Sequence, residues 1–239
     1  GHVLENETDS EFSIHAVGEI DAISDKNKIW FFMQANSDDE LADLLDVGVR
    51  RFVIDNEIDL DNLLRVVSVK GVVIDLLLRM KFQEHRITAG KYFIYGMESK
   101  KVNEIIYRLK NDSRIGKFGI HIHRKSQNAS EWEIKEELVD SLSAKSLERL
   151  DIINIGGGLP IRYRTYTSEI ESYIFDKIKE VKNWFPGSVY CEPGRFIAAP
   201  AGKLITQIMA VDSNNITVNA SVYNSDMDAI LVPVKLLVE

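Results

Sequence analysis

Short apolar runs alternate with amphipathic segments along most of this chain. Runs with the composition of buried strands lie at residues 12–16, 29–33, 51–54, 72–78, 118–123, 151–155 and 189–192. Between them, apolar residues recur at helical spacing, notably at 56–70, 99–110, 131–147 and 167–184. Regular alternation of strand and helix predicts an α/β fold in which parallel strands are connected by helices.

Local signals support the boundaries of several predicted helices. Ser37 is a predicted N-cap, and the acids Asp38, Asp39 and Glu40 follow it in the first turn, where the helix dipole favours negative charge. Pro186-Gly187 ends the helix at 167–184. Residues 80–96 show no clean period and predict a long loop between a strand and a helix.

The alternation stops near residue 202. Residues 204–211, 216–222 and 229–238 resemble consecutive strands, joined by turns at 212–215 and 224–225. We therefore predict a (β/α) domain at 3–201 and the beginning of a β domain at 202–239.

Chemically useful residues gather where the predicted strands end. Glu192, Pro193-Gly194 and Arg195 follow the last strand of the first domain, and Gly156 to Gly158 follow the strand before it. The strand at 118–123 carries His121 and His123, and the strand at 72–78 is followed by Arg79. Polar and glycine residues at the carboxyl ends of parallel strands are typical of the active face of a (β/α)8 barrel.

Composition narrows the possible partners and surroundings. The 239 residues are 45% hydrophobic with a net charge of −8, which argues against nucleic acid or an anionic membrane as the main partner. A single cysteine, Cys191, excludes an internal disulfide and is consistent with a reducing cytoplasm. We find no apolar run long enough to span a membrane and no signal peptide at the start of the chain.

The strand-end motifs resemble those of the fold-type III pyridoxal-phosphate decarboxylases, which act on ornithine, arginine, lysine or diaminopimelate. The resemblance extends from Phe12 to about Asp228 and rests on the order of four motifs. They are a strand ending in Arg79, Gly119-Ile120-His121-Ile122-His123 with Ser126-Gln127 after it, Asn154 to Pro160, and Glu192 to Arg195. The resemblance implies an alanine-racemase-like TIM barrel followed by a β domain. It also implies that this chain holds strands two to eight of the barrel and the start of the β domain.

The same resemblance implies pyridoxal 5'-phosphate as cofactor and roles for individual residues. Glu192 matches the acid beside the ring nitrogen, His123 the imidazole that stacks on the ring, and Arg79 a barrel arginine near the cofactor. The phosphate-binding residues would be Ser126, Gly156, Gly157, Gly158, Gly194 and Arg195. A small amino-acid substrate, a cytoplasmic homodimer and a place in amino-acid metabolism such as polyamine biosynthesis are also implied.

Plainer interpretations of these residues remain open. Glu192 and Arg195 also suit a salt bridge, the glycines suit tight turns, and His121 with His123 suits a metal pair, although no metal site is predicted. We expect His121 to point away from His123, and Cys191 to pack rather than react.

Several positions depart from the family pattern. Arg124-Lys125 stands before Ser126 where the family has Val/Ile-Gly, and Ser13 stands where the ornithine enzymes carry an acid. The family's Schiff-base lysine precedes this region, and none of the eleven residues before Phe12 is a lysine. We therefore expect this chain to be a fragment that is inactive alone. An inactive relative that regulates by binding, as antizyme inhibitors do, is the alternative, whereas an alanine racemase would carry arginine in place of Glu192.

Overall fold

The structure is a computed structural model that describes residues 2–82, 95–124, 130–161 and 168–225. Its contacts divide the chain into two units, Gly1–Arg195 and Phe196–Glu239. The predicted domain boundary after residue 201 stays a prediction. Lys125, Ser126, most of the predicted loop at 80–96 and the predicted strand at 229–238 lie outside the described residues.

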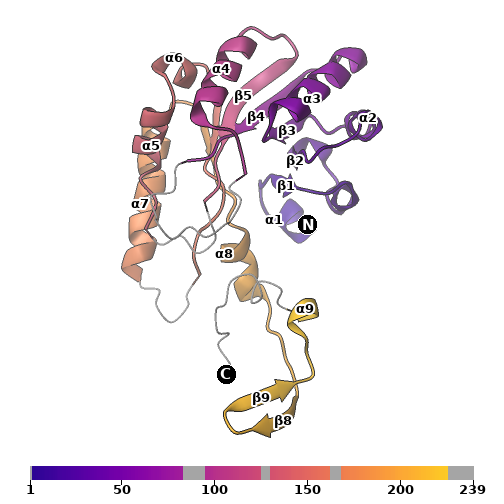
Figure 1. Ribbon diagram of the computed structural model, residues 1–239, viewed down its shortest axis with the longest axis vertical. Coiled ribbons are helices and arrows are strands. Elements are labelled where there is room, and N and C mark those ends of the chain that lie inside the picture. The colour runs from indigo at the N-terminus through magenta and orange to yellow at the C-terminus, as the bar shows by residue number, and fades with distance from the viewer. Residues whose placement is uncertain (1, 83–94, 125–129, 162–167, 226–239) are drawn as a thin grey trace. The chain divides into compact units, whose positions relative to one another are not determined.

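The first unit is built on a parallel sheet of seven described strands. Its order, β1-β2-β3-β4-β5-β6-β7, follows the sequence without rearrangement. The strands are β1 (Phe12–Ile14), β2 (Ile29–Phe32), β3 (Arg51–Ile54), β4 (Ile74–Arg79), β5 (Ile115–His121), β6 (Ile152–Asn154) and β7 (Ser188–Tyr190). The sheet curls, and most of the helices cover its outer face (Figure 1). This arrangement confirms the predicted barrel-type α/β fold.

The connections between strands are mainly helical. The described α-helices of the first unit are α1 (His2–Glu7), α2 (Asp38–Asp46), α3 (Glu57–Lys70), α4 (Ser99–Leu109), α5 (Ile134–Ser141), α6 (Ala144–Leu147) and α7 (Ser168–Trp184). A further helix, α8 (Gly194–Ala198), begins in the first unit and ends in the second. Short 3-10 helices lie at Val17–Ala22 and Lys26–Lys28 in the first unit, and at Ala199–Ala201 in the second.

The ends of α2 and α3 follow from their sequences. Ser37 Oγ accepts the backbone N–H of Glu40, while Glu40 Oε2 accepts the backbone N–H of Ser37, so both groups are satisfied at the start of α2. Asn56 caps α3 through the Asp59 amide, and Gly71 ends it in the left-handed conformation at φ 62°.

The single helix predicted at 131–147 is wrong, because the structure has α5 and α6 in its place. Leu142 is extended, with φ −114° and ψ 137°, and Ser143 caps α6. Asn103 on α4 stabilises the break, because its Oδ1 accepts the Ser143 amide at 2.9 Å and the Ser146 hydroxyl at 2.7 Å. Helical periodicity alone could not reveal this tertiary contact.

Large apolar side chains fill the inside of the curl. All four residues of β2 are buried, as expected for a strand covered on both faces. Together with neighbouring strands it forms a cluster against which Tyr190 packs, made of Trp30, Phe32, Val53, Leu77 and Ile152.

The strand that leads to Glu192 is less buried than predicted. Among the described strands β7 pairs only with β6, so it forms an edge of the sheet, and its three residues are half-buried. Cys191 is exposed, so the expectation that it packs is wrong. Desolvation, with a contribution from the charge of Glu192, still raises the pKa of its thiol.

The second unit contains an antiparallel hairpin of β8 (Ile208–Asp212) and β9 (Asn215–Val218), both exposed along their length. The strand predicted to run to residue 222 is wrong at its end, because β9 stops at Val218 and α9 (Val222–Ser225) follows. Ser221 explains the difference, since its hydroxyl accepts the Tyr223 amide at 3.2 Å and so starts a turn.

None of the helices in the described ranges is both long enough and apolar enough to cross a membrane.

Candidate functional site

Four polar side chains lie at or just beyond the carboxyl ends of adjacent strands. Arg79, His121 and Asn154 are the last residues of β4, β5 and β6, and Glu192 follows β7 by two residues. The Glu192 amide donates to Gly156 O at 2.8 Å, which extends the pairing of β6 and β7 up to the acid.

The Glu192 carboxylate is held by three side chains from three strands. Ser13 Oγ on β1 donates to Oε1 at 2.8 Å, and Asn154 Nδ2 donates to the same oxygen at 3.0 Å. His121 Nε2 lies 3.2 Å from Oε2. These donors fix the position of the carboxylate.

The three donors also keep Glu192 ionised. Burial alone would raise the pKa of this carboxyl, but the hydrogen bonds from His121, Ser13 and Asn154 hold it below its usual range. Burial lowers the pKa of His121, and the hydrogen bond to Glu192 offsets that effect only in part. At neutral pH the pair is therefore a carboxylate beside a neutral imidazole.

The expectation that His121 points away from the site is wrong. Residues two apart on a strand face the same side, and the rings of His121 and His123 are stacked at 6.3 Å between centroids. His121 is 1% exposed, whereas His123 is more open to solvent.

His123 lies where β5 gives way to the following loop. Its Nδ1 accepts the Gly157 N–H at 3.2 Å. The other ring nitrogen, Nε2, takes no part in this hydrogen bond. Burial is the main cause that lowers the pKa of His123 to about 4, and the charges of His121 and Arg79 add to it. The imidazole is therefore neutral at physiological pH.

The glycine loop after β6 differs in detail from the predicted phosphate cradle. The Gly156 N–H donates to Asn154 Oδ1 at 2.8 Å, the Gly157 N–H donates to His123, and the Gly194 N–H donates to Glu192 O at 2.8 Å. These three amides therefore point at protein acceptors. Glycine is nevertheless required at Gly157, because a Cβ there would lie 2.8 Å from Glu192 O.

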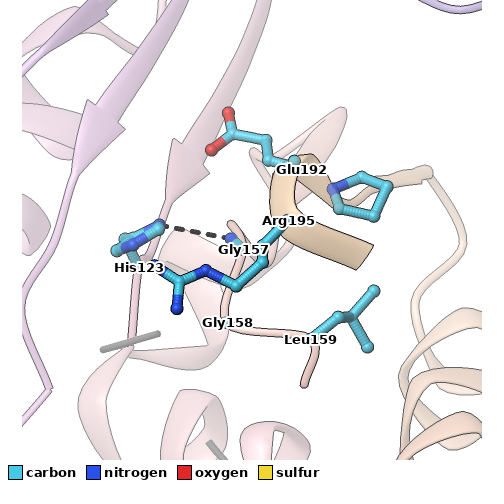
Figure 2. Close-up of a pocket in the computed structure, with 8 residues that line it drawn as sticks. His123, Gly157, Gly158, Leu159, Glu192 and Arg195 are labelled. Atoms are coloured by element: carbon cyan, nitrogen blue, oxygen red, sulfur yellow. Dashed lines mark hydrogen bonds between the residues drawn. The ribbon is translucent and has the colours of Figure 1, made fainter. Parts of the chain in front are cut away.

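A cavity of about 200 Å³ opens between the glycine loop and the residues that follow β7. Figure 2 shows His123, Gly157 and Gly158 on its wall together with Glu192 and Arg195. Leu159, Pro193 and Gly194 complete the lining. Gly156, another predicted phosphate ligand, is not among the residues that line it.

Arg79 lines a different and larger cavity, of about 550 Å³, above the ends of β1 to β4. Burial lowers the pKa of its guanidinium, against the opposing charges of Asp55 and Glu192, and its Nε is buried without a partner. The cation packs over the Tyr95 ring at 5.5 Å. Arg79 is therefore near Glu192 electrostatically but does not line the cavity with His123.

Arg124 is occupied by structural contacts. Its buried guanidinium pairs with Glu137 and, at 3.6 Å, with Glu131. The segment before α5 is thus held to the end of β5, and Arg124 does not line the cavity.

Ligand-type atoms of His121, His123 and Glu192 lie within 4.8 Å of one another. The Arg79 charge reaches both imidazoles and opposes a second cation at this point. We assign no metal to the group.

Sequence reasoning missed Ser13, Asn154 and His121 as partners of Glu192. Asn154 carried a usable signal, since it is a polar residue within the apolar run 152–155 at a strand end. Ser13 is separated from Glu192 by 179 positions, so no local pattern connects the two.

The side chains of the cavity match the chemical groups of a phosphorylated pyridine. An ionised acid suits a protonated ring nitrogen, a neutral imidazole suits a ring face, and a guanidinium beside a glycine loop suits a phosphate. Gly157 forms part of the cavity wall through its backbone, since a Cβ there would lie 2.8 Å from Glu192 O.

Comparison with known proteins identifies similar sequences and folds. A family model described as the pyridoxal-binding domain of pyridoxal-dependent decarboxylases matches residues 7–199. The diaminopimelate decarboxylase of Pseudomonas aeruginosa is 26% identical over 213 residues, which cover 82% of this chain and 51% of that protein. The corresponding protein of Haemophilus influenzae is 25% identical, covering 94% of this chain and 58% of the relative.

Two solved structures share the fold. Diaminopimelate decarboxylase from Helicobacter pylori, complexed with L-lysine, has a TM-score of 0.79 at 22% identity and covers 98% of this chain and 63% of that one. Lysine decarboxylase from Selenomonas ruminantium has a TM-score of 0.74 at 19% identity, with coverage of 97% and 63%. The chain spans about half the length of the first curated relatives it matches.

Proposed function

The chain belongs to the pyridoxal-dependent decarboxylases through their pyridoxal-binding domain, and from this premise we propose that it is the cofactor-binding part of a diaminopimelate decarboxylase. The observation that carries the proposal is the cavity shared by ionised Glu192, neutral His123 and Arg195. The choice of substrate rests on the curated relatives, which are diaminopimelate decarboxylases. Loss of one carboxyl group from diaminopimelate gives lysine, so we propose a role in lysine formation rather than in polyamine biosynthesis.

Each cavity residue has a distinct task in this proposal. Glu192 holds a proton at the ring nitrogen of the cofactor, His123 supports one face of the ring, and Arg195 with Gly158 binds the phosphate. Ser126 stays a predicted phosphate ligand outside the described residues. Pyridoxal phosphate, when bound, supplies an electron sink for the electron pair released by loss of carbon dioxide.

Arg79 is proposed to act at the mouth of the site. Its half-buried guanidinium forms no ion pair within the described ranges and lies in a cavity with Asp55 and Asp59. A cation in such a place orients a carboxylate of the substrate or an oxygen of the cofactor. The second cavity would hold the part of the substrate that does not react.

One observation favours the alternative of a regulatory relative without activity. The amides of Gly156, Gly157 and Gly194 donate to protein acceptors, which leaves fewer loop donors for a phosphate than predicted. The alternative predicts that the chain does not bind pyridoxal phosphate.

The decisive experiment is a titration of the chain with pyridoxal phosphate, followed by absorbance and fluorescence. We expect saturable binding that Arg195→Met weakens at least tenfold, because one guanidinium bonded to phosphate contributes about 1.5–3 kcal/mol. Glu136→Gln, on an exposed acid of α5, is the matched control and should bind like the parent. Absence of binding would support the regulatory alternative.

Activity is tested in the full-length product of the gene, by carbon dioxide release from diaminopimelate, lysine, ornithine and arginine. Diaminopimelate should be the preferred substrate. Glu192→Gln should reduce turnover about a hundredfold, or roughly 3 kcal/mol, because the ring nitrogen loses the charge that keeps it protonated. A variant that retains half of the parent rate would disprove the role of Glu192.

A further inference from the structure

His121 is a buried polar side chain to which the proposed function gives no role. It ends β5, is 1% exposed, and lies between the edge of Phe32, at 5.0 Å and 86°, and the stacked ring of His123. Its Nε2 is 3.2 Å from Glu192 Oε2, and its Nδ1 is buried without a hydrogen-bond partner.

The hydrogen bonds on Glu192 can be counted against its capacity. A carboxylate offers about four acceptor positions, two on each oxygen. Ser13 and Asn154 occupy both positions on Oε1, and His121 occupies one on Oε2. One acceptor position of the carboxylate therefore remains, and it is on Oε2, the oxygen bonded to His121. Glu192 also lines the cofactor cavity.

The surroundings of His121 determine its protonation state. Glu192 favours the imidazolium form of His121, whereas Arg79 and His15 oppose it. The neutral ring of His123 also faces it, stacked at 6.3 Å. An imidazolium would also bury a second N–H, at Nδ1, without an acceptor. The neutral ring with its proton on Nε2 satisfies the bond to Glu192 and avoids that cost.

A neutral donor has a consequence that a lysine or arginine would not have. It orients the carboxylate without cancelling its charge, so the full negative charge stays available to a cation in the cavity. Ser13 and Asn154 share this property, since both are uncharged donors. The three partners therefore orient Glu192 and leave its charge unpaired.

We propose that His121 is a positioning residue, which as the neutral Nε2-protonated imidazole holds Glu192 Oε2 so that its remaining acceptor position faces the cofactor cavity. The inference rests on the proposed role of Glu192 at the ring nitrogen. Asn154 supports the same arrangement from β6, because its amide is fixed by the Gly156 N–H on one side and Glu192 on the other.

The first test uses the chain without cofactor. Long-range nitrogen–proton correlation spectra should show His121 as the neutral Nε2-protonated tautomer at neutral pH, and it should stay neutral at the lower pH where an exposed histidine takes up its second proton. In His121→Leu the Glu192 carboxyl carbon should titrate at a higher pH than in the parent. His121→Asn, whose amide can still donate, should lie between the two. An Nδ1-protonated ring, or a Glu192 titration that His121→Leu leaves unchanged, would overturn the proposal.

The second test adds pyridoxal phosphate. We expect His121→Leu to weaken binding about tenfold above pH 7, where the ring nitrogen loses its proton unless Glu192 is oriented, and His121→Asn to stay within about threefold of the parent. Glu136→Gln, on an exposed acid of α5, is again the control and should bind normally. Equal losses in His121→Asn and His121→Leu would mean that the residue only fills space.

The two tests separate this inference from the proposed function. If the parent chain does not bind the cofactor, the proposed function fails, yet the tautomer and the Glu192 titration still decide whether His121 positions the acid. If the parent binds and His121→Leu binds equally well at every pH, the inference fails and the proposed function stands.

Discussion

His123 makes the stability of the folded chain depend on pH. Its pKa is about 4 in the folded chain and 6.5 by default in an unfolded one. Between these values the unfolded chain binds a proton that the folded chain does not, so the free energy of unfolding falls as the pH drops from 6.5 to 4. Because the side chain is partly exposed, we discount the full shift to about 1 kcal/mol.

The measurement is urea unfolding at pH 7 and pH 4.5 for the parent and for His123→Gln. The parent should lose about 1 kcal/mol more than the variant over this range. His121 contributes in the same direction in both proteins and cancels in the difference. Parallel losses in the two proteins would show that His123 is not held neutral by the fold.

For individual site residues, the sequence predicted which strand end each one occupies but not which side chains it contacts. The apolar runs placed Glu192, His123 and the glycine loop at one edge of the sheet, because parallel strands end together. Side-chain partners were not predictable, since they depend on the curl of the sheet. The direction of His121 was an error of reasoning, because the two-residue period of a strand places it on the same side as His123.

At the scale of elements, the end of α3 offers a clean test of backbone conformation. Gly71 has φ 62°, and a Cβ added there would meet no atom within 4 Å. Gly71→Ala should therefore destabilise the fold by about 1 kcal/mol through the left-handed backbone alone. Gly18 has equally open space without a left-handed φ, so Gly18→Ala is the control and should change stability by less than about 0.5 kcal/mol.

Thermal or urea unfolding of both variants checks this prediction. If Gly18→Ala loses as much stability as Gly71→Ala, the loss at Gly71 is not caused by its left-handed φ.

Elements with strong local signals were predicted well, and elements defined by tertiary contacts were not. α2 and α3 carry their own caps, Ser37 and Asn56, and both helices lie where the sequence placed them. The division between α5 and α6 depends on Asn103, and the exposure of β7 depends on its position at the edge. Neither of these two features changes the hydrophobic periodicity of the sequence, so the pattern could not predict them.

At the scale of the whole molecule, local stability should differ widely between the two units. β4 is central in its sheet and largely buried, whereas every residue of β8 and β9 is exposed. An isolated two-stranded hairpin is marginally stable in water. At high dilution, where the chain is monomeric, we expect amides of β8 and β9 to exchange with deuterium within seconds, and those of β4 to be protected until global unfolding.

Exchange followed by mass spectrometry on peptides of this chain tests the difference. Protection of the hairpin comparable to that of β4 would mean that another surface covers it in solution.

Self-association is the further expectation at this scale. Apolar side chains of the hairpin are more than half exposed, namely Ile208 at 58%, Met209 at 61%, Val211 at 66% and Ile216 at 57%. Burying them against a second copy is favourable, which agrees with the homodimer expected in the sequence analysis. Light scattering at tens of micromolar should show a dimer or larger species, and Val211→Lys should shift it towards monomer. A monomer under these conditions would contradict the prediction.

The two edges of the curled sheet also have a use in engineering. Within the described sheet, β1 and β7 each have one neighbour, yet Ser13 on β1 reaches Glu192 beyond β7 at 2.8 Å. A short peptide that paired in parallel with either edge would carry its own side chains to the rim beside that acid. We therefore expect a separately supplied strand to add to one of these edges, so that fragment complementation could bring a chosen side chain to the site.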